Sequence, residues 1–216
     1  MSGLPRSPRL LKGGLVLIDA ATSVVQRIIA LQYNPDSLTR TLQVQGVGPE
    51  SGDRSEILRL KGPPVETLKV EAELDATDQL EITDSVATDV GLQPQLAALE
   101  IIVYPTSIQL QTLNSQAQSG TLEVAAVESP LTVFVWSRQR IIPVRLTDFS
   151  ITEEAFDPNL NPIRAKVSLG MRVLNVNDTG FDHKAGGLFM TYLQNKEQLA
   201  RRSRATAFSA LGITGV

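Results

Sequence analysis

Residues 149–175, FSITEEAFDPNLNPIRAKVSLGMRVLN, decide the fold class of this chain. The stretch divides into a strand, a wide turn and a second strand. From Ile163 to Val173, apolar side chains occupy every second position over eleven residues, whereas a typical strand has about five or six residues. The positions between them carry Arg164, Lys166, Ser168 and Arg172. This alternation predicts a long strand with one buried face and one polar face.

The turn between these two strands is specified by Asp157-Pro158-Asn159 and Asn161-Pro162. Each proline fixes its own φ and favours extended geometry for the residue before it. The Asp and Asn side chains can cap the turn with hydrogen bonds to nearby backbone. Before the turn, apolar residues from Ile141 onward predict a strand that runs to about Ala155.

Alternation and turn chemistry predict further elements along the chain. Strands are expected over residues 10–19, 24–32, 38–44, 66–75 and 131–136. Leucines at three- or four-residue spacing predict a helix over 89–104, with Pro94 near its start and Pro105 ending it. A C-terminal helix is expected to open at Gly186-Gly187. The segment 105–129 is rich in Gln, Ser and Thr and leaves two alternatives, short structured pieces or a long loop.

The order of these elements predicts a mainly β protein of the α+β class, with one central helix and a C-terminal helix. A chain of 216 residues is long enough to bury a core of its own. We expect a flexible N-terminal arm over residues 1–9, a β-domain over 10–176, and a C-terminal helix with a basic tail over 177–216.

Composition excludes several classes of site. The chain has no cysteine and a single histidine, His183, which excludes disulfides, thiolate metal sites and histidine-rich metal sites. A formal charge of −3 gives no overall case for nucleic-acid binding. No apolar run approaches the roughly 20 residues that a membrane span needs. The N-terminus lacks the apolar region of a signal peptide, so the expected location is the cytoplasm.

Charge is unevenly distributed along the chain. Between Thr41 and Glu100 acidic residues exceed basic ones by eight, whereas from Lys184 onward basic residues exceed acidic ones by four. One interpretation is a solvated surface of both signs. The other is that the acidic middle and the basic tail meet across a subunit boundary.

Residues with catalytic potential do not form a recognisable constellation. Glu153 and Glu154 are adjacent on an expected strand, so their side chains point to opposite faces. The pair Asp182-His183 has no nucleophilic serine motif near it. Phosphate-binding glycine motifs and the nucleophile-elbow motif are missing from the sequence. We therefore expect a protein that is not an enzyme and has no cofactor.

Several short stretches together resemble the tube-type domain of phage-tail-like contractile injection systems. They are LQYNPDSL (31–38), EAELD (71–75), Leu99-Glu100, Tyr104-Pro105, LTVFVW (131–136) and FDPNLNPIRAKV (156–167). The resemblance spans roughly residues 10–175, and its specific parts are the Asn-Pro turn and the last block. It implies a small β-barrel or sandwich of the tail-tube kind, with six copies in a ring.

Within that family the chain is most similar to the tube-initiating baseplate adaptor, which sits between the spike and the inner tube. Such adaptors often continue into a LysM module, whereas this chain ends in a helix and a basic tail. That departure puts a peptidoglycan-binding role in doubt, and leaves the adaptor and another tube-layer protein as alternatives.

The resemblance also implies partners and contact residues. The partners are further copies of the chain in a homohexamer, an inner-tube protein, a spike or hub protein, and sheath or other baseplate proteins, within an assembled injection particle. Nucleic acid and membrane are not expected as partners. Candidate inter-subunit or lumen residues are Tyr33, Asn34, Pro35, Arg164, Lys166, Arg172, Arg201 and Arg202. The loop 45–55, the segment 105–129 and both termini are candidate contact arms. The polar face of 163–175 is expected either to line a lumen or to face ordinary solvent.

A carbohydrate- or peptide-binding β-module without catalysis is the alternative function. Such a module would show an exposed cluster of aromatic residues, yet aromatic residues make up only 5% of the chain. The single tryptophan, Trp136, ends an apolar strand, where packing in the core or a turn is expected. A small-molecule barrel would need converging polar groups inside it, which the pattern does not mark.

Overall fold

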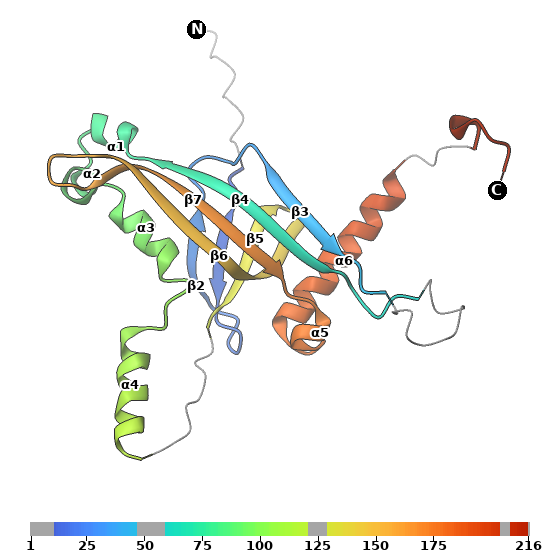
Figure 1. Ribbon diagram of the computed structural model, residues 1–216, viewed down its shortest axis with the longest axis horizontal. Helices are drawn as coiled ribbons and strands as arrows, with labels where there is room; N and C mark the ends of the chain where they lie inside the picture. Colours follow the sequence, from blue (N-terminus) through green and yellow to red (C-terminus); the bar gives the residue numbers. More distant parts are fainter. Residues whose placement is uncertain (1–10, 47–58, 121–128, 204–207, 216) are drawn as a thin grey trace, which may run out of the picture.

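The computed structural model describes residues 11–46, 59–120, 129–203 and 208–215; the expected arm 1–9 and most of the 45–55 loop lie outside them. Seven strands form one antiparallel sheet in the order β2-β1-β5-β6-β7-β4-β3 (Figure 1). The strands are β1 (Gly14–Ile18), β2 (Val25–Ala30), β3 (Leu38–Gln43), β4 (Val65–Asp75), β5 (Leu131–Ser137), β6 (Arg140–Phe156) and β7 (Pro162–Val173). The expected class, mainly β with additional helices, is confirmed.

Helices occupy the interval between β4 and β5 and the C-terminal region. They are α1 (Thr77–Glu81), α2 (Ser85–Val90), α3 (Gln93–Glu100), α4 (Ser107–Gln118), α5 (Val176–Thr179) and α6 (Lys184–Arg202), followed by the 3-10 helix η3 (Phe208–Leu211). The expectation of one central helix is therefore wrong, since the described residues between β4 and β5 already form four helices.

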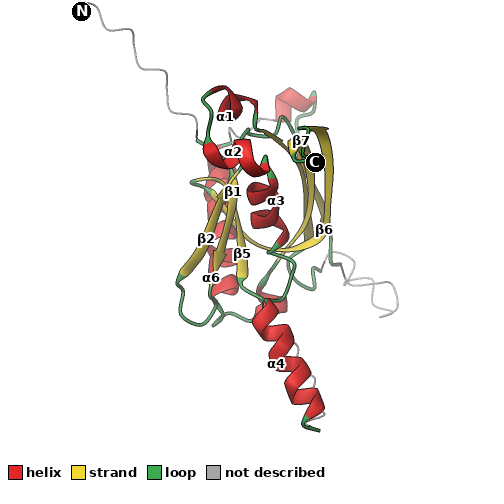
Figure 2. Ribbon diagram, turned by 90° about the vertical axis from the view of Figure 1, so that its left-hand side faces the viewer, coloured by secondary structure: helices red, strands yellow, loops and turns green. Residues whose placement is uncertain are grey.

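The sheet curves strongly but does not close, so the expected barrel is corrected to an open sheet with β2 and β3 at its edges (Figure 2). The curvature brings the end of β2 close to the end of β4. There the Gln32 side chain donates to Asp75 O at 2.6 Å and accepts from Asp75 N at 2.9 Å. In a closed barrel, backbone hydrogen bonds between two strands would join the sheet here. In this protein a single side-chain amide makes the contact instead.

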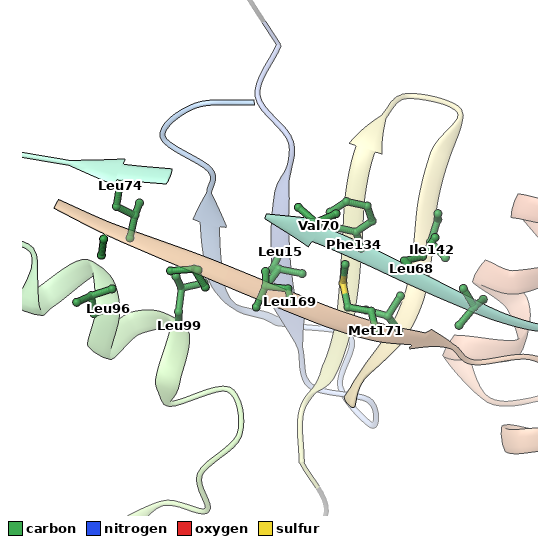
Figure 3. Packing of buried hydrophobic residues seen from close by; sticks show 14 of the residues in the cluster. Leu15, Leu68, Val70, Leu74, Leu96, Leu99, Phe134, Ile142, Leu169 and Met171 are labelled. Carbon is green, nitrogen blue, oxygen red and sulfur yellow. The ribbon is translucent and has the colours of Figure 1, made fainter. Parts of the chain in front are cut away.

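The core lies on the concave face of the sheet. Leucines 68 and 169, from β4 and β7, are each 1% exposed and belong to one apolar cluster with Phe134 of β5 (Figure 3). Leu96 and Leu99 of α3 join the same cluster, and α3 lies inside the curve of the sheet (Figure 2). Burying a side chain of this size stabilises the fold by about 1.5–3 kcal/mol. The apolar face that alternation gives β7 is therefore the surface against which the helices pack.

The β6–β7 turn is built around two polar side chains, as its sequence predicts. Asp157 Oδ1 accepts hydrogen bonds from the backbone N–H groups of Asn159 and Asn161, both at 2.8 Å. Asp157 Oδ2 accepts from Asn161 Nδ2 at 2.9 Å. These hydrogen bonds, chiefly those from Asn161, hold the pKa of the Asp157 carboxyl below its usual value. Within this turn Leu160 adopts a positive φ of 65°.

The same turn is fastened to the helical layer. Asn161 Nδ2 also donates to Asp89 O at 3.0 Å, and Asn161 Oδ1 accepts from Gln93 Nε2 at 3.0 Å. Gly91, with φ of +59°, lies against the backbone of Pro162, where a Cβ would come within 2.4 Å of the Pro162 oxygen. This close approach needs glycine. The expected helix 89–104 is therefore shortened to α3, and its first two residues are instead the end of α2.

One open question is decided and one expectation is corrected near the ends of helices. Of the alternatives for segment 105–129, the structure supports a structured piece, α4, which is opened by a capping box between Thr106 and Gln109; residues 121–128 lie outside the described residues. The C-terminal helix begins at Lys184 rather than at Gly186-Gly187, with His183 as its N-cap. Gly186 lies within the first turn, where a Cβ would come 2.0 Å from Gly180 O, so the glycine serves packing against α5 rather than helix initiation.

Replacing Asn161 with alanine is expected to lower the free energy of unfolding by about 2–3 kcal/mol, because Asp157, Asp89 and Gln93 all lose a buried partner. Urea unfolding followed by circular dichroism measures this change. Asn159→Ala is the matched control, since Asn159 is exposed in the same turn and is expected to cost less than about 0.5 kcal/mol. Equal losses in both variants would contradict the assigned role of the Asn161 amide.

Candidate subunit interface

Four strands, β3, β4, β7 and β6, present a polar face opposite the core. Its side chains form rows across the strands, for example Glu73, Lys166 and Thr152. The face carries five basic and five acidic residues: Lys69, Arg145, Arg164, Lys166 and Arg172, with Glu71, Glu73, Asp75, Asp148 and Glu154. We call this surface the polar face. It is highly charged, yet its charges balance.

Ion pairs on the polar face join neighbouring strands. Arg164 Nε lies 3.0 Å from Asp75 Oδ2, and Lys166 Nζ lies 3.0 Å from Glu154 Oε1. The Glu154 carboxylate raises the pKa of Lys166. Hydrogen bonds from Thr77, and then the Arg164 guanidinium, lower the pKa of Asp75. The side chains of Arg164 and Lys166 are 53% and 55% exposed, so both remain accessible to a partner or to a lumen.

Arg172 differs from the other two predicted basic residues of β7. Its Nη2 atom lies 2.6 Å from Asp178 Oδ1, and its side chain is 28% exposed. Asp178 lies in α5, where its carboxylate also accepts from Asn175 N as part of a capping box. Arg172 therefore fastens β7 to the following helix, and its role is mainly structural.

Both lateral margins of the polar face have unpaired backbone. In the described part of the chain, β3 pairs only with β4. Among the described residues, strand β6 pairs with β5 only as far as Val144, and from Arg145 to Phe156 it pairs with β7 alone. A β-bulge at Thr147 separates the apolar positions Leu146 and Phe149 by one extra residue. Exposed strand edges of this length are sites where another strand can add.

The predicted Tyr33-Asn34-Pro35 turn serves two different purposes. Asn34 Oδ1 accepts from Gly13 N at 2.9 Å, and Asn34 Nδ2 donates to Leu11 O at 2.8 Å. Asn34 thus holds the segment before β1 and is an intramolecular tie. Tyr33 is 46% exposed and stays accessible, whereas Pro35 is half-buried.

The structure brings some predicted site residues together and keeps others apart. Gln32, beside the predicted turn, binds the backbone of Asp75, and the Asp75 carboxylate binds Arg164. The turn and the polar face therefore meet at Asp75. Arg201 and Arg202 lie far from this point, exposed in the last turn of α6.

Sequence reasoning missed a buried ionic cluster that joins the edge strand to α6. Glu66 of β4 is 3% exposed; its Oε1 accepts from Tyr192 Oη at 2.8 Å and its Oε2 lies 2.7 Å from Lys196 Nζ. Arg40 of β3 approaches Oε1 to 3.7 Å, and Lys196 stands 4.0 Å above the Tyr192 ring. Burial, and next the Glu66 carboxylate, raise the pKa of Tyr192. A signal was available: Glu66 is in phase with the apolar side of β4, two residues before Leu68.

Two further features bear on ligand binding. A hollow of about 290 Å³ lies between β2, α3 and the sheet, lined mainly by aliphatic side chains such as Leu31 and Leu169. Among the described residues, Gln95 Oε1 is a buried side-chain atom that lacks a hydrogen-bond partner.

Two other kinds of site are missing from the described part of the chain. No three acidic, histidine or cysteine residues lie close enough together to bind a metal ion there, and no helix in it is long and apolar enough to cross a membrane.

Comparisons with known protein families and with curated proteins give no match. Among solved structures, the tail of an empty gene transfer agent (GTA) particle with C6 symmetry is similar at 12% sequence identity and a TM-score of 0.29. The alignment covers 75% of this chain and 90% of that chain. A TM-score of this size does not establish a shared fold, and no functional conclusion follows from it.

Tyr192→Phe is expected to lower the free energy of unfolding by about 1–2 kcal/mol, because the buried Glu66 carboxylate loses one of its donors. Thermal and urea unfolding measure the change. Tyr104→Phe removes the same hydroxyl from a residue that is 67% exposed and is expected to have no measurable effect. If the two variants behaved alike, the Tyr192 hydroxyl would not be needed as a hydrogen-bond donor to Glu66.

The two arginines of β7 are expected to differ in their contribution to stability. Arg164→Gln should cost less than about 1 kcal/mol, because its ion pair with Asp75 is exposed to solvent. Arg172→Gln should cost about 1–2 kcal/mol, because its short, partly buried bond to Asp178 joins two elements. Urea midpoints of the two variants provide the comparison, and a larger loss for Arg164 would reverse the assignment.

Proposed function

We propose that this protein is a non-enzymatic structural ring component of a contractile injection system, linking the spike or hub of the baseplate to the inner tube. Two independent lines support the proposal. The first is the resemblance of residues 31–38 and 156–167 to tube-type domains. The second, which carries the proposal, is the pair of unpaired strand edges on either side of the polar face.

The directions of these edges suit a closed ring. Neighbouring strands in the order β6-β7-β4-β3 are antiparallel, so β3 runs opposite to β6. Rotation about an axis along the strands leaves strand direction unchanged. The β3 edge of one copy would therefore meet the free part of the β6 edge of the next as an antiparallel pair. Such a heterologous contact repeats around a ring until the rotation closes.

The two edges also match in polarity. On the core side, β6 presents the half-buried Phe149 and Ile151. On the same side β3 presents Leu38 and Leu42, and the Arg40 side chain between them is turned toward Glu66. On the polar side, β6 presents Ser150 and β3 presents Thr41. Joining the edges would place apolar side chains beside apolar ones and polar beside polar, which stabilises cross-strand pairs.

In such a ring the polar face would turn toward the lumen. Its balanced charges, with Arg164 and Lys166 already paired to carboxylates, leave little net attraction for cargo of either sign. Cargo could then slide along the surface without strong binding. The alternative is that the polar face is exposed to ordinary solvent. In that case the unpaired strand edges would have no role in assembly.

We further infer that six copies form the ring, with the inner-tube protein and the spike or hub protein as axial neighbours and sheath or other baseplate proteins outside. Assembly in the cytoplasm, within an injection particle, accords with this role. Helix α4 suits a contact arm, because none of its residues is buried and Ile108 is 74% exposed (Figure 1). It lies within the predicted arm 105–129.

The rival function, a carbohydrate- or peptide-binding module, gains less support. Trp136 packs against the core and its ring lies 5.8 Å from that of Phe134. It is therefore part of the packing of β5 rather than a platform for a ligand. The hollow beneath β2 is lined mainly by aliphatic side chains and by no aromatic ring, so it lacks the stacking platform of a carbohydrate site.

Leu42→Lys is expected to abolish ring formation without unfolding the chain, because it places a charge on the apolar side of the β3 edge. Light scattering with size-exclusion chromatography would report a hexamer for the unaltered protein and a smaller species for the variant. Ile28→Lys, at the opposite edge strand β2 and 71% exposed, is the matched control that should leave the ring intact.

Cysteine pairs give a positive test, since the chain has no cysteine of its own. Thr39 or Thr41 of β3 would be changed to cysteine together with Ser150 or Thr152 of β6. A correct pairing yields, after oxidation, a ladder of cross-linked species that ends at six chains. Single-cysteine variants should give no ladder. A protein that stays monomeric, both alone and with its neighbouring gene products, would overturn the proposal.

A further inference from the structure

Strand β2 forms an edge of the sheet that the proposed ring contact leaves free. Among the described residues it pairs with β1 alone, at the margin of the sheet (Figure 2). The Leu31 N–H group donates to Gly13 O at 2.9 Å, on the β1 side. Because this direction alternates along an antiparallel pair, Ile29 also bonds toward β1, whereas the backbone groups of Ile28 and Ala30 point away from the sheet. An extended segment can add to an edge that presents such groups.

The hollow beneath β2 lies along this edge. It has a volume of about 290 Å³, and its lining comes from β2, β4, β7 and α3. Ile29 and Leu31 line it from β2 and the residue that follows it, and Leu74, Leu99 and Leu169 line it from the other three elements. Side chains on one face of a strand are two residues apart, so a strand added to β2 would turn every second side chain toward this hollow. Aliphatic side chains are therefore favoured at those positions.

Gln95 provides a second, independent observation. It lines the same hollow, its Oε1 atom is buried, and no group of the described residues donates a hydrogen bond to that atom. A buried acceptor without a partner is unfavourable, and such atoms are rare in folded proteins. The hollow therefore lacks a hydrogen-bond donor. A bound peptide supplies donors from its backbone N–H groups, whereas a purely aliphatic ligand supplies none.

Arg27 adds a positive charge beside the hollow. Alternation places it on the same face of β2 as Ile29 and Leu31, and it lines both this hollow and a neighbouring one of about 590 Å³. Arg27 is exposed, and no described residue forms an ion pair or a hydrogen bond with its side chain. A guanidinium that has no carboxylate partner and lies beside an aliphatic wall favours an acidic group in a ligand.

We propose that the β2 edge binds an extended segment of a partner protein as an added antiparallel strand. The segment carries two aliphatic residues at alternate positions and an acidic residue two positions further on. In this register the aliphatic side chains enter the hollow beside Leu31 and Ile29, and the carboxylate reaches Arg27. Backbone hydrogen bonds to Ile28 and Ala30 supply affinity, and the alternate side chains supply specificity.

This site goes beyond the proposed ring, because it lies on β2 and not on the β3 or β6 edge. It would give a structural protein a point at which a partner chain is tethered, and it does not replace the structural role. The two proposals are tested by different measurements, mass for the ring and peptide affinity for the β2 edge. Either proposal can therefore fail without the other.

The probe is a capped, fluorescently labelled nonapeptide in which valine, leucine and glutamate occupy alternate positions in that order, with threonine or serine between them. Fluorescence anisotropy with the full-length protein should show saturable binding. A second peptide, with lysine in place of the glutamate, should bind about tenfold more weakly or worse, because the charge-assisted hydrogen bonds to Arg27 are lost. Absence of saturable binding of the glutamate peptide up to about 1 mM would overturn the proposal.

Charge reversal tests the contact with Arg27. Arg27→Glu should weaken binding of the glutamate peptide by about tenfold or more and should restore binding of the lysine peptide. Lys69→Glu makes the same change in net charge on the polar face and should leave both affinities unchanged. If the lysine peptide gained no affinity for the Arg27→Glu variant, the assignment of the carboxylate to Arg27 would be wrong.

Filling the hollow tests the aliphatic contact. Ala98 lines the hollow, so Ala98→Phe should occupy it and abolish peptide binding while the melting temperature stays the same or rises. Ala97→Phe is the matched control, because Ala97 is the preceding residue of α3 and is exposed. It should leave the affinity unchanged. Equal affinities for the two variants would exclude the hollow from the binding site.

Hydrogen exchange on the unaltered protein locates the bound peptide without relying on any variant. The peptide should slow exchange of the Ile28 and Ala30 amides, because these N–H groups would gain hydrogen-bond partners. Exchange along the β3 edge should not change. Saturable binding without protection of β2 would contradict the addition of a strand at this edge.

Discussion

The side-chain amide of Asn161 is the constraint on which the arrangement of sheet and helices depends. It is 8% exposed, and its two polar atoms bind Asp157, Asp89 and Gln93, which belong to three separate segments. A buried amide left without partners would cost free energy, so all of these bonds together stabilise the position of the turn. The turn that reverses the chain between β6 and β7 is thereby also the point where the α2–α3 layer attaches, and α3 follows into the concave face of the sheet.

A second buried polar group, the Glu66 carboxylate, also joins separate elements, at the opposite end of β4. Burying the Glu66 side chain at 3% exposure is costly unless its oxygens find partners, and Lys196 and Tyr192 of α6 and Arg40 of β3 supply them. Edge strand and terminal helix are therefore coupled through one carboxylate. Since β3 is the edge that we assign to the subunit contact, the position of α6 bears on how that edge is presented.

Helices occupy the core side, and within the described ranges nothing covers the polar face or pairs with the two strand edges. Natural proteins usually protect such edges with charge, proline or a covering loop. Here the free part of β6 carries a bulge at Thr147 but continues as a strand to Phe156, and β3 shows Leu42 on its apolar side. Edges of this kind suit a chain whose sheet is completed by another copy.

The sequence by itself determined the strands, the β6–β7 turn and the polarity of β7, because alternation at period two and Asp-Pro and Asn-Pro chemistry act over a few residues. It also identified Arg164 and Lys166 as accessible. Only the tertiary structure decided that the sheet stays open, that Gly91 divides the central helix, that Asn34 and Arg172 are internal ties, and that Glu66 is buried. Each of these features depends on a contact between residues that are distant in the chain. The local sequence pattern does not indicate which distant residue a given side chain will contact.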